Sequence, residues 1–210
     1  FESRALNKEE MKILVNKLVE ACLPPGERKK MRDLTGNELF HYVEPRHQKP
    51  LIEPVWELGG AVYRHRLVQM DYQKANGESS HPLVKPVGIM CSEYYFYLIA
   101  YIGDNDKKYP GYPTVYRIDR ILEYKILDEG FEIPYKDRFE EGEFRKRIPF
   151  MYTGKLHKAA FTYTGPDINA VLDRLPTAVA VKQEDGSYRV TAEVYGEKGL
   201  AMWLRGQEIK

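Results

Sequence analysis

The hydrophobic period of the sequence changes at Arg66, from the spacing typical of helices to the alternation typical of strands, so the chain has to combine N-terminal helices with a sheet. Residues 66–73 alternate, which predicts a strand. The Asn-Gly pair at residues 76–77 then gives the strongest short hairpin signal. The returning segment, residues 81–89, contains Pro86. Because proline has no N–H to donate, we expect Pro86 at a strand end, a bulge or a sheet edge.

The first helix is predicted by a start signal, a periodic run and a stop signal. Asn7 followed three residues later by Glu10 is a capping-box pattern, in which each residue caps the backbone of the other. Apolar residues then recur at helical spacing until Pro24 and Pro25 end the segment.

Two weaker helical segments precede the first strand. One runs over about residues 31–43 and is interrupted by Gly36. The other covers about residues 52–64, although its glycine pair costs about 1 kcal/mol per residue relative to alanine. Between them, residues 44–50 hold two prolines and no apolar residue, which is typical of a linker.

Two further strands carry an unusual mixture of side chains. Side chains alternate between the two faces of the strand predicted at residues 94–102. One face carries Tyr94, Phe96, Leu98, Ala100 and Ile102, and the other carries Tyr95, Tyr97, Ile99 and Tyr101. In the strand predicted at residues 114–121 the two sides hold Tyr116, Ile118 and Arg120, against Val115, Arg117 and Asp119. Charges within such strands have to be paired or to lie at a rim. Short strands that are apolar on both faces over part of their length favour a small barrel over an open sheet.

The last third of the chain predicts a separate unit. Residues 136–147 form a charge-dense connector, typical of a solvated helix or linker. The segments after it are a strand with Ala159, Phe161 and Tyr163, a helix after Pro166, a strand near 177–183, a turn at Asp185-Gly186, a strand over 188–194 and an apolar segment at 199–204. The order strand, helix, strand, strand, helix is that of a ferredoxin-like split unit without its final strand.

Composition limits the partners and the compartment. The net charge of +1 provides no global field toward nucleic acid or membrane, so a basic site has to be local. Cys22 and Cys91 form no disulfide framework or zinc pattern, and a cytosolic, cytoplasmic setting fits best. No apolar run reaches the roughly 20 residues that span a bilayer, so we expect no membrane partner. The chain begins at Phe1, and we expect it to be a fragment.

The chain offers no visible catalytic machinery. Its five histidines include no zinc-binding spacing, and no nucleophile elbow, phosphate-binding loop or dinucleotide fingerprint is present. The carboxylates at residues 140–143 lie in a charged run where nothing would raise a pKa for acid catalysis. We therefore expect no catalytic residue, no metal, no cofactor and no enzymatic activity.

Aromatic residues close to arginines are the remaining chemical signal. The chain has 16 tyrosines against 8 phenylalanines and 2 tryptophans. Aromatic faces stack bases while cations meet phosphates, which is how single-stranded nucleic acid or nucleotides are held. The alternative is structural: the tyrosines belong to a barrel core with hydroxyls at its rim, and Arg117 and Asp119 form an i, i+2 ion pair on one strand face.

Several motifs together resemble those of the WYL-domain family. These are Tyr72 ahead of the N-G-E turn, V-K-P-V-G at residues 84–88, Phe96-Tyr97-Leu98, and TVYRIDRI at residues 114–121. Phe96 replaces the usual tryptophan of the family. The segment from about residue 155, with MWLRGQ near its end, is similar to the C-terminal extension that accompanies WYL domains, and residues 1–45 fit the helical linker of such proteins.

The resemblance implies a bacterial transcription regulator of α+β class. The expected parts are a helical linker and dimerisation segment at residues 1–48, a small Sm- or SH3-like barrel at 49–134, and a ferredoxin-like βαββα extension with its charged connector at 135–210. The family's N-terminal winged helix-turn-helix, which binds operator DNA, is not in this chain and is expected upstream of Phe1. The resemblance further implies a homodimer and a nucleotide or single-stranded nucleic-acid effector.

The same resemblance selects the candidate ligand residues. Tyr72 matches the tyrosine of the first barrel strand, and Arg117, Asp119 and Arg120 match the R-x-D-R element. Two positions depart from the pattern, because Lys74 replaces a small serine and Pro82, beside His81, replaces an arginine. The complete candidate set is Tyr72, Lys74, His81, Tyr95, Tyr97, Arg117, Asp119 and Arg120.

Two alternative functions remain open at this point. The barrel and extension could serve only to dimerise the regulator, without a ligand. The chain could instead process nucleotides as an enzyme, which turnover with a divalent metal would reveal.

Overall fold

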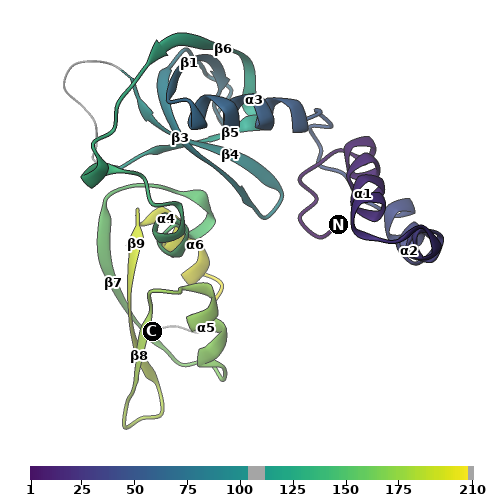
Figure 1. The fold of residues 1–210 in the computed structure, drawn as a ribbon. Coiled ribbons are helices and arrows are strands. Elements are labelled where there is room, and N and C mark those ends of the chain that lie inside the picture. The colour runs from purple at the N-terminus through teal and green to yellow at the C-terminus, as the bar shows by residue number, and fades with distance from the viewer. Residues whose placement is uncertain (104–111, 208–210) are drawn as a thin grey trace. The chain divides into compact units, whose positions relative to one another are not determined.

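The computed structural model describes residues 1–103 and 112–207 of an α+β chain. N-terminal helices precede a curled antiparallel sheet, and a smaller sheet with its own helices follows (Figure 1). The chain divides into two compact units. The first comprises Phe1–Ile99 and Tyr116–Phe131, and the second comprises Ala100–Val115 and Glu132–Lys210.

The three predicted N-terminal helices are confirmed as α1 (Lys8–Cys22), α2 (Pro25–Phe40) and α3 (Ile52–Tyr63). The Asn7 side chain caps α1 by accepting the Glu10 N–H at 2.9 Å. The reciprocal half of the capping box is wrong. Glu10 Oε1 instead accepts the N–H groups of Leu51 and Ile52, each at 2.7 Å, and so caps α3 from 41 residues away.

A small core joins the N-terminal helices to the sheet of the same unit. It consists of Leu6, Met11 and Tyr42, with Phe96 of the sheet packed against them. The Tyr42 hydroxyl donates to the Leu6 carbonyl at 2.7 Å, which satisfies the polar end of this buried ring.

Six strands form the larger sheet: β1 (Arg66–Gln73), β2 (Ser79–Ser80), β3 (Leu83–Ser92), β4 (Tyr95–Ile102), β5 (Thr114–Arg117) and β6 (Ile121–Gly130). The order is β2-β1-β3-β4-β5, with β6 also paired to β1, and the sheet curls into a half-barrel. The predicted turn is present, with Gly77 at a positive φ of 88° that suits glycine. The core beneath is made of fully buried side chains, among them Leu58 and Ala61 of α3 with Val68, Val84, Leu98 and Ile99 of the strands.

Strand β6 was not predicted. It pairs with β1 from Arg66↔Gly130 to Tyr72↔Ile121, yet Ile121 is its only buried residue. Its other side chains are exposed or half-buried, so the segment shows no buried face in sequence. Backbone hydrogen bonds to β1 hold it in the sheet instead.

One local prediction is wrong, and another is narrowed. The strand expected at residues 114–121 ends at Arg117, and a 3₁₀ turn, η1 (Ile118–Arg120), separates β5 from β6. Because a 3₁₀ turn has three residues per turn, the expected alternation is lost and the neighbours Ile118 and Asp119 are both buried. Of the three placements expected for Pro86, the strand end is excluded, because Pro86 is the fourth residue of the ten in β3. This is tolerated because the pairing of β3 with β1 involves Leu83 and Val84, before the proline.

The second unit confirms the predicted element order. Its sheet contains β7 (Leu156–Tyr163), β8 (Val179–Lys182) and β9 (Tyr188–Tyr195), with α5 (Ile168–Arg174) after β7 and α6 (Lys198–Leu204) after β9. The order is β7-β9-β8, with β9 antiparallel to both neighbours, which is the arrangement of a split unit. Its core cluster is Phe161, Tyr163, Val171, Leu175, Val190, Ala192, Val194 and Leu200.

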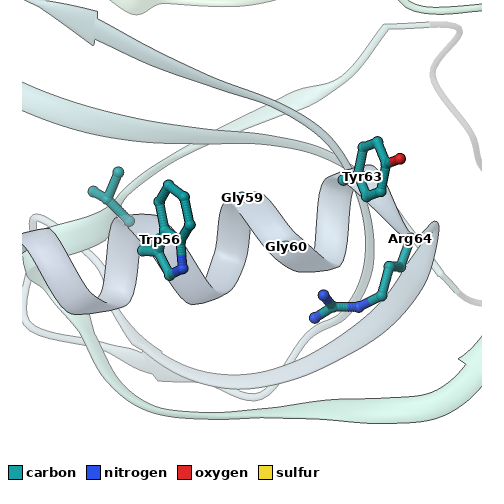
Figure 2. Close-up of a pocket in the computed structure, with 6 residues that line it drawn as sticks. Trp56, Gly59, Gly60, Tyr63 and Arg64 are labelled. Carbon is teal, nitrogen blue, oxygen red and sulfur yellow. The ribbon is translucent and has the colours of Figure 1, made fainter.

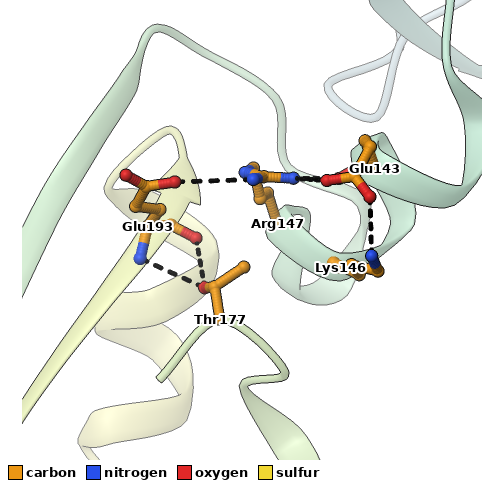
Figure 3. A network of polar contacts seen from close by, with 5 residues as sticks. All are labelled: Glu143, Lys146, Arg147, Thr177 and Glu193. Carbon is orange, nitrogen blue, oxygen red and sulfur yellow. Dashed lines mark hydrogen bonds and ion pairs between the residues drawn. The ribbon is translucent and has the colours of Figure 1, made fainter. Parts of the chain in front are cut away.

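The charged connector contains the helix α4 (Glu141–Arg147), with η2 (Tyr135–Asp137) at the start of the connector and η3 (Pro149–Met151) directly after the helix. The guanidinium of Arg147 bridges the carboxylates of Glu143 and Glu193, the latter at 3.5 Å (Figure 3). Hydrogen bonds from Lys146 and Arg147 lower the pKa of Glu143 to about 2. The Thr177 hydroxyl donates to the Glu193 carbonyl at 2.7 Å and accepts its N–H at 3.1 Å, which ties the segment before β8 to β9.

Candidate functional site

Five of the eight predicted site residues lie together in the first unit. We call Tyr72, Tyr95, Tyr97, Arg117 and Asp119 the Arg117 cluster. Tyr72 comes from the end of β1, the other two tyrosines from β4, Arg117 from the end of β5 and Asp119 from η1. Because β4 and β5 are hydrogen-bonded neighbours and η1 follows β5 directly, segments distant in sequence meet at one end of the half-barrel.

A buried ion pair forms the centre of the cluster. Arg117 donates from Nε to Asp119 Oδ1 at 3.0 Å and from Nη2 to Oδ2 at 2.7 Å, a two-point contact. Only 5% of the Asp119 side chain and 21% of the Arg117 side chain are exposed. Burial alone would lower the pKa of Arg117, but the hydrogen bond and charge of Asp119 outweigh it and raise that pKa. The ion pair expected under the structural alternative is therefore present, although Asp119 lies in a 3₁₀ turn and not on a strand face.

Aromatic rings surround the guanidinium. The Arg117 guanidinium carbon lies 3.3 Å from the centroid of the Tyr95 ring, a cation–π contact. Tyr97 meets Tyr95 edge to face at 6.4 Å, and burial raises the pKa of Tyr97 to about 12. The Tyr72 hydroxyl accepts the Arg117 backbone N–H at 3.2 Å, and its ring meets Tyr116 edge to face. These tyrosines thus support the arginine, while Tyr95 and Tyr97 remain partly exposed.

Arg120 is the other cation of the turn. It is half-buried, and it forms no hydrogen bond or ion pair with any residue in the ranges 1–103 and 112–207. Its charge is therefore not neutralised by the acid that holds Arg117.

Lys74 and His81 lie on the hairpin that β1 and β2 form. Lys74 pairs with Glu78 at 3.1 Å, and His81 Nδ1 lies 2.7 Å from Asp71 Oδ1. Both side chains are more than half exposed. Within the described residues neither contacts the Arg117 cluster, so the structure does not bring these two predicted residues to it.

Lys49 of the linker contacts the same turn, His47 is hydrogen-bonded to Lys49, and neither residue was predicted. Lys49 Nζ donates to the backbone carbonyls of Asp119 at 2.7 Å and Ile121 at 3.5 Å. His47 Nδ1 accepts the Lys49 N–H at 3.0 Å, while its buried Nε2 has no partner in the described structure. Burial lowers the pKa of His47, with Asp119 opposing and Arg117 and Lys49 reinforcing that effect. The only sequence signal was the presence of basic residues in an apparent linker.

A hollow of about 470 Å³ lies beside η1 in the same unit. Ile118, Ile121 and Pro54 supply its apolar walls, and Lys49 and Glu123 are its charged residues. Since the Lys49 ammonium is already bound by two carbonyls and an acid lies close by, this hollow is a poorer anion site than the turn that carries Arg120.

Metal and membrane features can be assessed over the same ranges. No group of three or more histidine, cysteine, aspartate or glutamate side chains that could hold a metal ion occurs in the described part of the chain. No helix within residues 1–103 and 112–207 combines the length and apolar character needed to cross a membrane.

Comparison with known proteins identifies one domain. Residues 56–126 match the family model of the WYL domain, so the match extends from Trp56 in α3 to Ile126 in β6. Among solved structures, the proteasome accessory factor B/C (PafBC) of Arthrobacter aurescens is similar at 17% identity and a TM-score of 0.36. That similarity covers 73% of this chain and 23% of the other, so this chain spans about a quarter of that protein. Curated protein sequences gave no match.

Proposed function

We propose, from the premise that the chain contains a WYL domain at residues 56–126, that it is the ligand-sensing and dimerising part of a bacterial transcription regulator. A WYL domain is a regulatory, sensing type of domain, which supports the coarse assignment. The finer proposal is that the effector is a nucleotide or single-stranded nucleic acid. Operator DNA would be bound by a helix-turn-helix domain outside these 210 residues, and the domains proposed for this chain are residues 1–48, 49–134 and 135–210.

The observation that carries the proposal is the Arg117 cluster with Arg120 beside it. Tyr95 and Tyr97 provide partly exposed rings on which bases can stack, at about 1 to 3 kcal/mol per base. Arg120 provides a cation that is not paired within the described residues, and Arg117 retains N–H groups that Asp119 does not use. Lys74 and His81 belong to the proposed site as an outer part that a longer oligonucleotide could reach.

The linker contacts suggest how a bound effector would act. Lys49 holds the backbone of η1, and Glu10 caps α3, so residues 1–51 touch both the turn of the proposed site and the helix behind the sheet. An effector that changes the position of η1 would shift the populations of linker arrangements. It does so only to the extent that its affinity differs between them.

The test is a titration with short single-stranded DNA and RNA, and with mono- and cyclic dinucleotides, at two salt concentrations. The wild-type chain is compared with Arg120→Ala and with Arg46→Ala, a matched loss of an exposed linker arginine. We expect at least a tenfold weaker affinity for Arg120→Ala, little change for Arg46→Ala, and weaker wild-type binding at high salt because phosphate contacts release counterions. Equal affinities for the two folded variants would show that the site is misplaced.

A second candidate function is a dimerisation module without a ligand. It is favoured by the pairing of Arg117 with Asp119, of Lys74 with Glu78 and of His81 with Asp71, so that three of the four basic candidates have an acid partner. Its expected result is that no tested ligand binds to the folded wild-type chain, while the chain still dimerises.

A further inference from the structure

The outward face of helix α3 carries large apolar and aromatic side chains, which is unusual for a helix that faces solvent. Trp56 is 82% exposed and Tyr63 is 85% exposed, and Ile52, one turn before Trp56, is 43% exposed. The opposite side of the helix is buried through Leu58 and Ala61. A surface helix usually shows polar residues outward, so large apolar residues on both sides indicate a second contact.

The outward face has a hollow at its middle. Figure 2 shows Trp56 and Tyr63 on the same side of α3 with Gly59 and Gly60 between them, around a hollow of about 400 Å³. A Cβ atom on Gly60 would lie 2.9 Å from the Arg64 guanidinium, which bends back along the helix, and one on Gly59 would meet only Ile89, at 3.8 Å. At Gly59 the absence of a side chain allows another helix to approach the backbone closely, whereas at Gly60 the flexible Arg64 side chain has to move aside.

We propose that this surface binds the same surface of a second copy of the chain, with the two α3 helices antiparallel. We call Ile52, Trp56, Gly59, Gly60, Tyr63 and Arg64 the α3 face. The inference rests on the dimer of the proposed function and names its interface. A two-fold axis between Gly59 and Gly60 places Trp56 against the partner subunit's Tyr63, and Tyr63 against the partner subunit's Trp56. These large side chains fill the space on either side of the glycines.

The charges on the same helix fit this arrangement. Glu53 and Glu57 are exposed in its first half and Arg64 at its C-terminal end, and the Arg64 guanidinium has no hydrogen bond or ion pair with a described residue. The antiparallel crossing brings Arg64 close to the partner subunit's Glu53 and Glu57, whereas a parallel pair would place acid beside acid. Two acids against one cation also disfavour a phosphate backbone as the occupant.

The expected affinity is modest. A helix of twelve residues is about 18 Å long, so the α3 pair alone covers less area than a standard interface. Tryptophan, tyrosine and arginine, which the α3 face contributes, are the residue types that carry most binding energy at interfaces. We expect a dimer with a dissociation constant in the micromolar range.

Sedimentation equilibrium of the 210-residue chain tests the proposal. The variants are Trp56→Ala with Tyr63→Ala, and the control is Tyr135→Ala, which removes another tyrosine that is 79% exposed. Both α3 side chains are solvated, so their loss leaves the fold intact. We expect at least a tenfold higher dimer dissociation constant for the α3 variant and no change for the control.

A charge exchange tests the antiparallel arrangement. Arg64→Glu is expected to weaken the dimer, and the addition of Glu53→Arg is expected to restore it, because the two positions meet across the two-fold axis. A dimer that withstands all these changes, or a chain that is monomeric at every concentration, would overturn the inference.

The oligonucleotide titration separates this inference from the proposed function. If Trp56→Ala with Tyr63→Ala dissociates the dimer while no ligand binds to the wild type, the α3 face stands and the effector site fails. If Arg120→Ala abolishes binding while the α3 variant remains a dimer, the effector site stands and the α3 face fails.

Discussion

Two arginines, one in each unit, are buried to the same degree but have different neighbours. Arg117 is 21% exposed and Arg147 is 20% exposed, and each lies between an acid and an element that it holds in place. The carboxylate of Asp119 is 5% exposed, whereas those of Glu143 and Glu193 are 44% and 41% exposed. The burial of the acid, more than that of the arginine, therefore determines how much each pair matters, because water and salt screen exposed carboxylates.

Within the first unit, the two arginines of the turn also have different roles. Arg117 was selected from sequence as a ligand residue, and its contacts show that it first holds η1 against β4. Arg120, three residues later, has no such partner among the described residues. Within one motif, Arg117 thus stabilises the turn, while the charge of Arg120 is not paired with an acid among the described residues.

The largest effect is expected for Asp119→Ala. Removing this carboxylate leaves the half-buried Arg117 without its partner, so we expect a loss of about 3 kcal/mol in the free energy of unfolding, by analogy with broken buried ion pairs. Urea denaturation measures it. Asp71→Ala is the matched control, since Asp71 is 44% exposed and pairs with His81. A loss below about 1 kcal/mol would place the Arg117 pair in the class of surface ion pairs.

A smaller effect is expected for Arg147→Met. This change breaks the bridge to two exposed carboxylates but retains much of the side-chain volume, so we expect a loss of about 0.5 kcal/mol. At high salt the loss is expected to disappear for Arg147→Met and to persist for Asp119→Ala. Equal salt dependence of the two losses would contradict the distinction between the two arginines.

The smallest effect concerns pH. Burial lowers the pKa of His47 in the folded chain, so below the unfolded value of about 6.5 the unfolded chain binds more protons. The free energy of unfolding is therefore expected to fall as the pH decreases from 7 to 5.5. The slope is expected to be shallower in His47→Gln, as measured by urea denaturation at each pH. Identical slopes would mean that another group causes the loss.

Sequence patterns predicted elements where one face is buried. Helix α1 and strands β1, β7 and β9 show regular apolar spacing because each has a clear inside and outside. Strand β6 does not, since its membership of the sheet depends on backbone pairing, and η1 replaces a strand because Ile118 and Asp119 both turn inward.

In the candidate site, contacts between residues close in sequence could be predicted, and contacts between distant residues could not. Arg117 and Asp119 are two residues apart, so their pairing was visible as an alternative in the sequence. Lys49 reaches Asp119 over 70 positions and Glu10 reaches Leu51 over 41, and no local pattern encodes such contacts. That these residues act on a ligand stays a prediction.

Because the Glu10 side chain caps α3, removing residues 1–48 would also remove the cap of that helix. A shortened protein that starts at residue 49 would contain all of α3, yet the N–H groups of Leu51 and Ile52 would have lost their acceptor. The first turn of that helix would fray into solvent, and Trp56, which follows that turn, would lie next to an end that is no longer fixed. The smallest autonomous piece of this sheet therefore includes α1, and a truncation within the linker would separate the helix from the carboxylate that caps it.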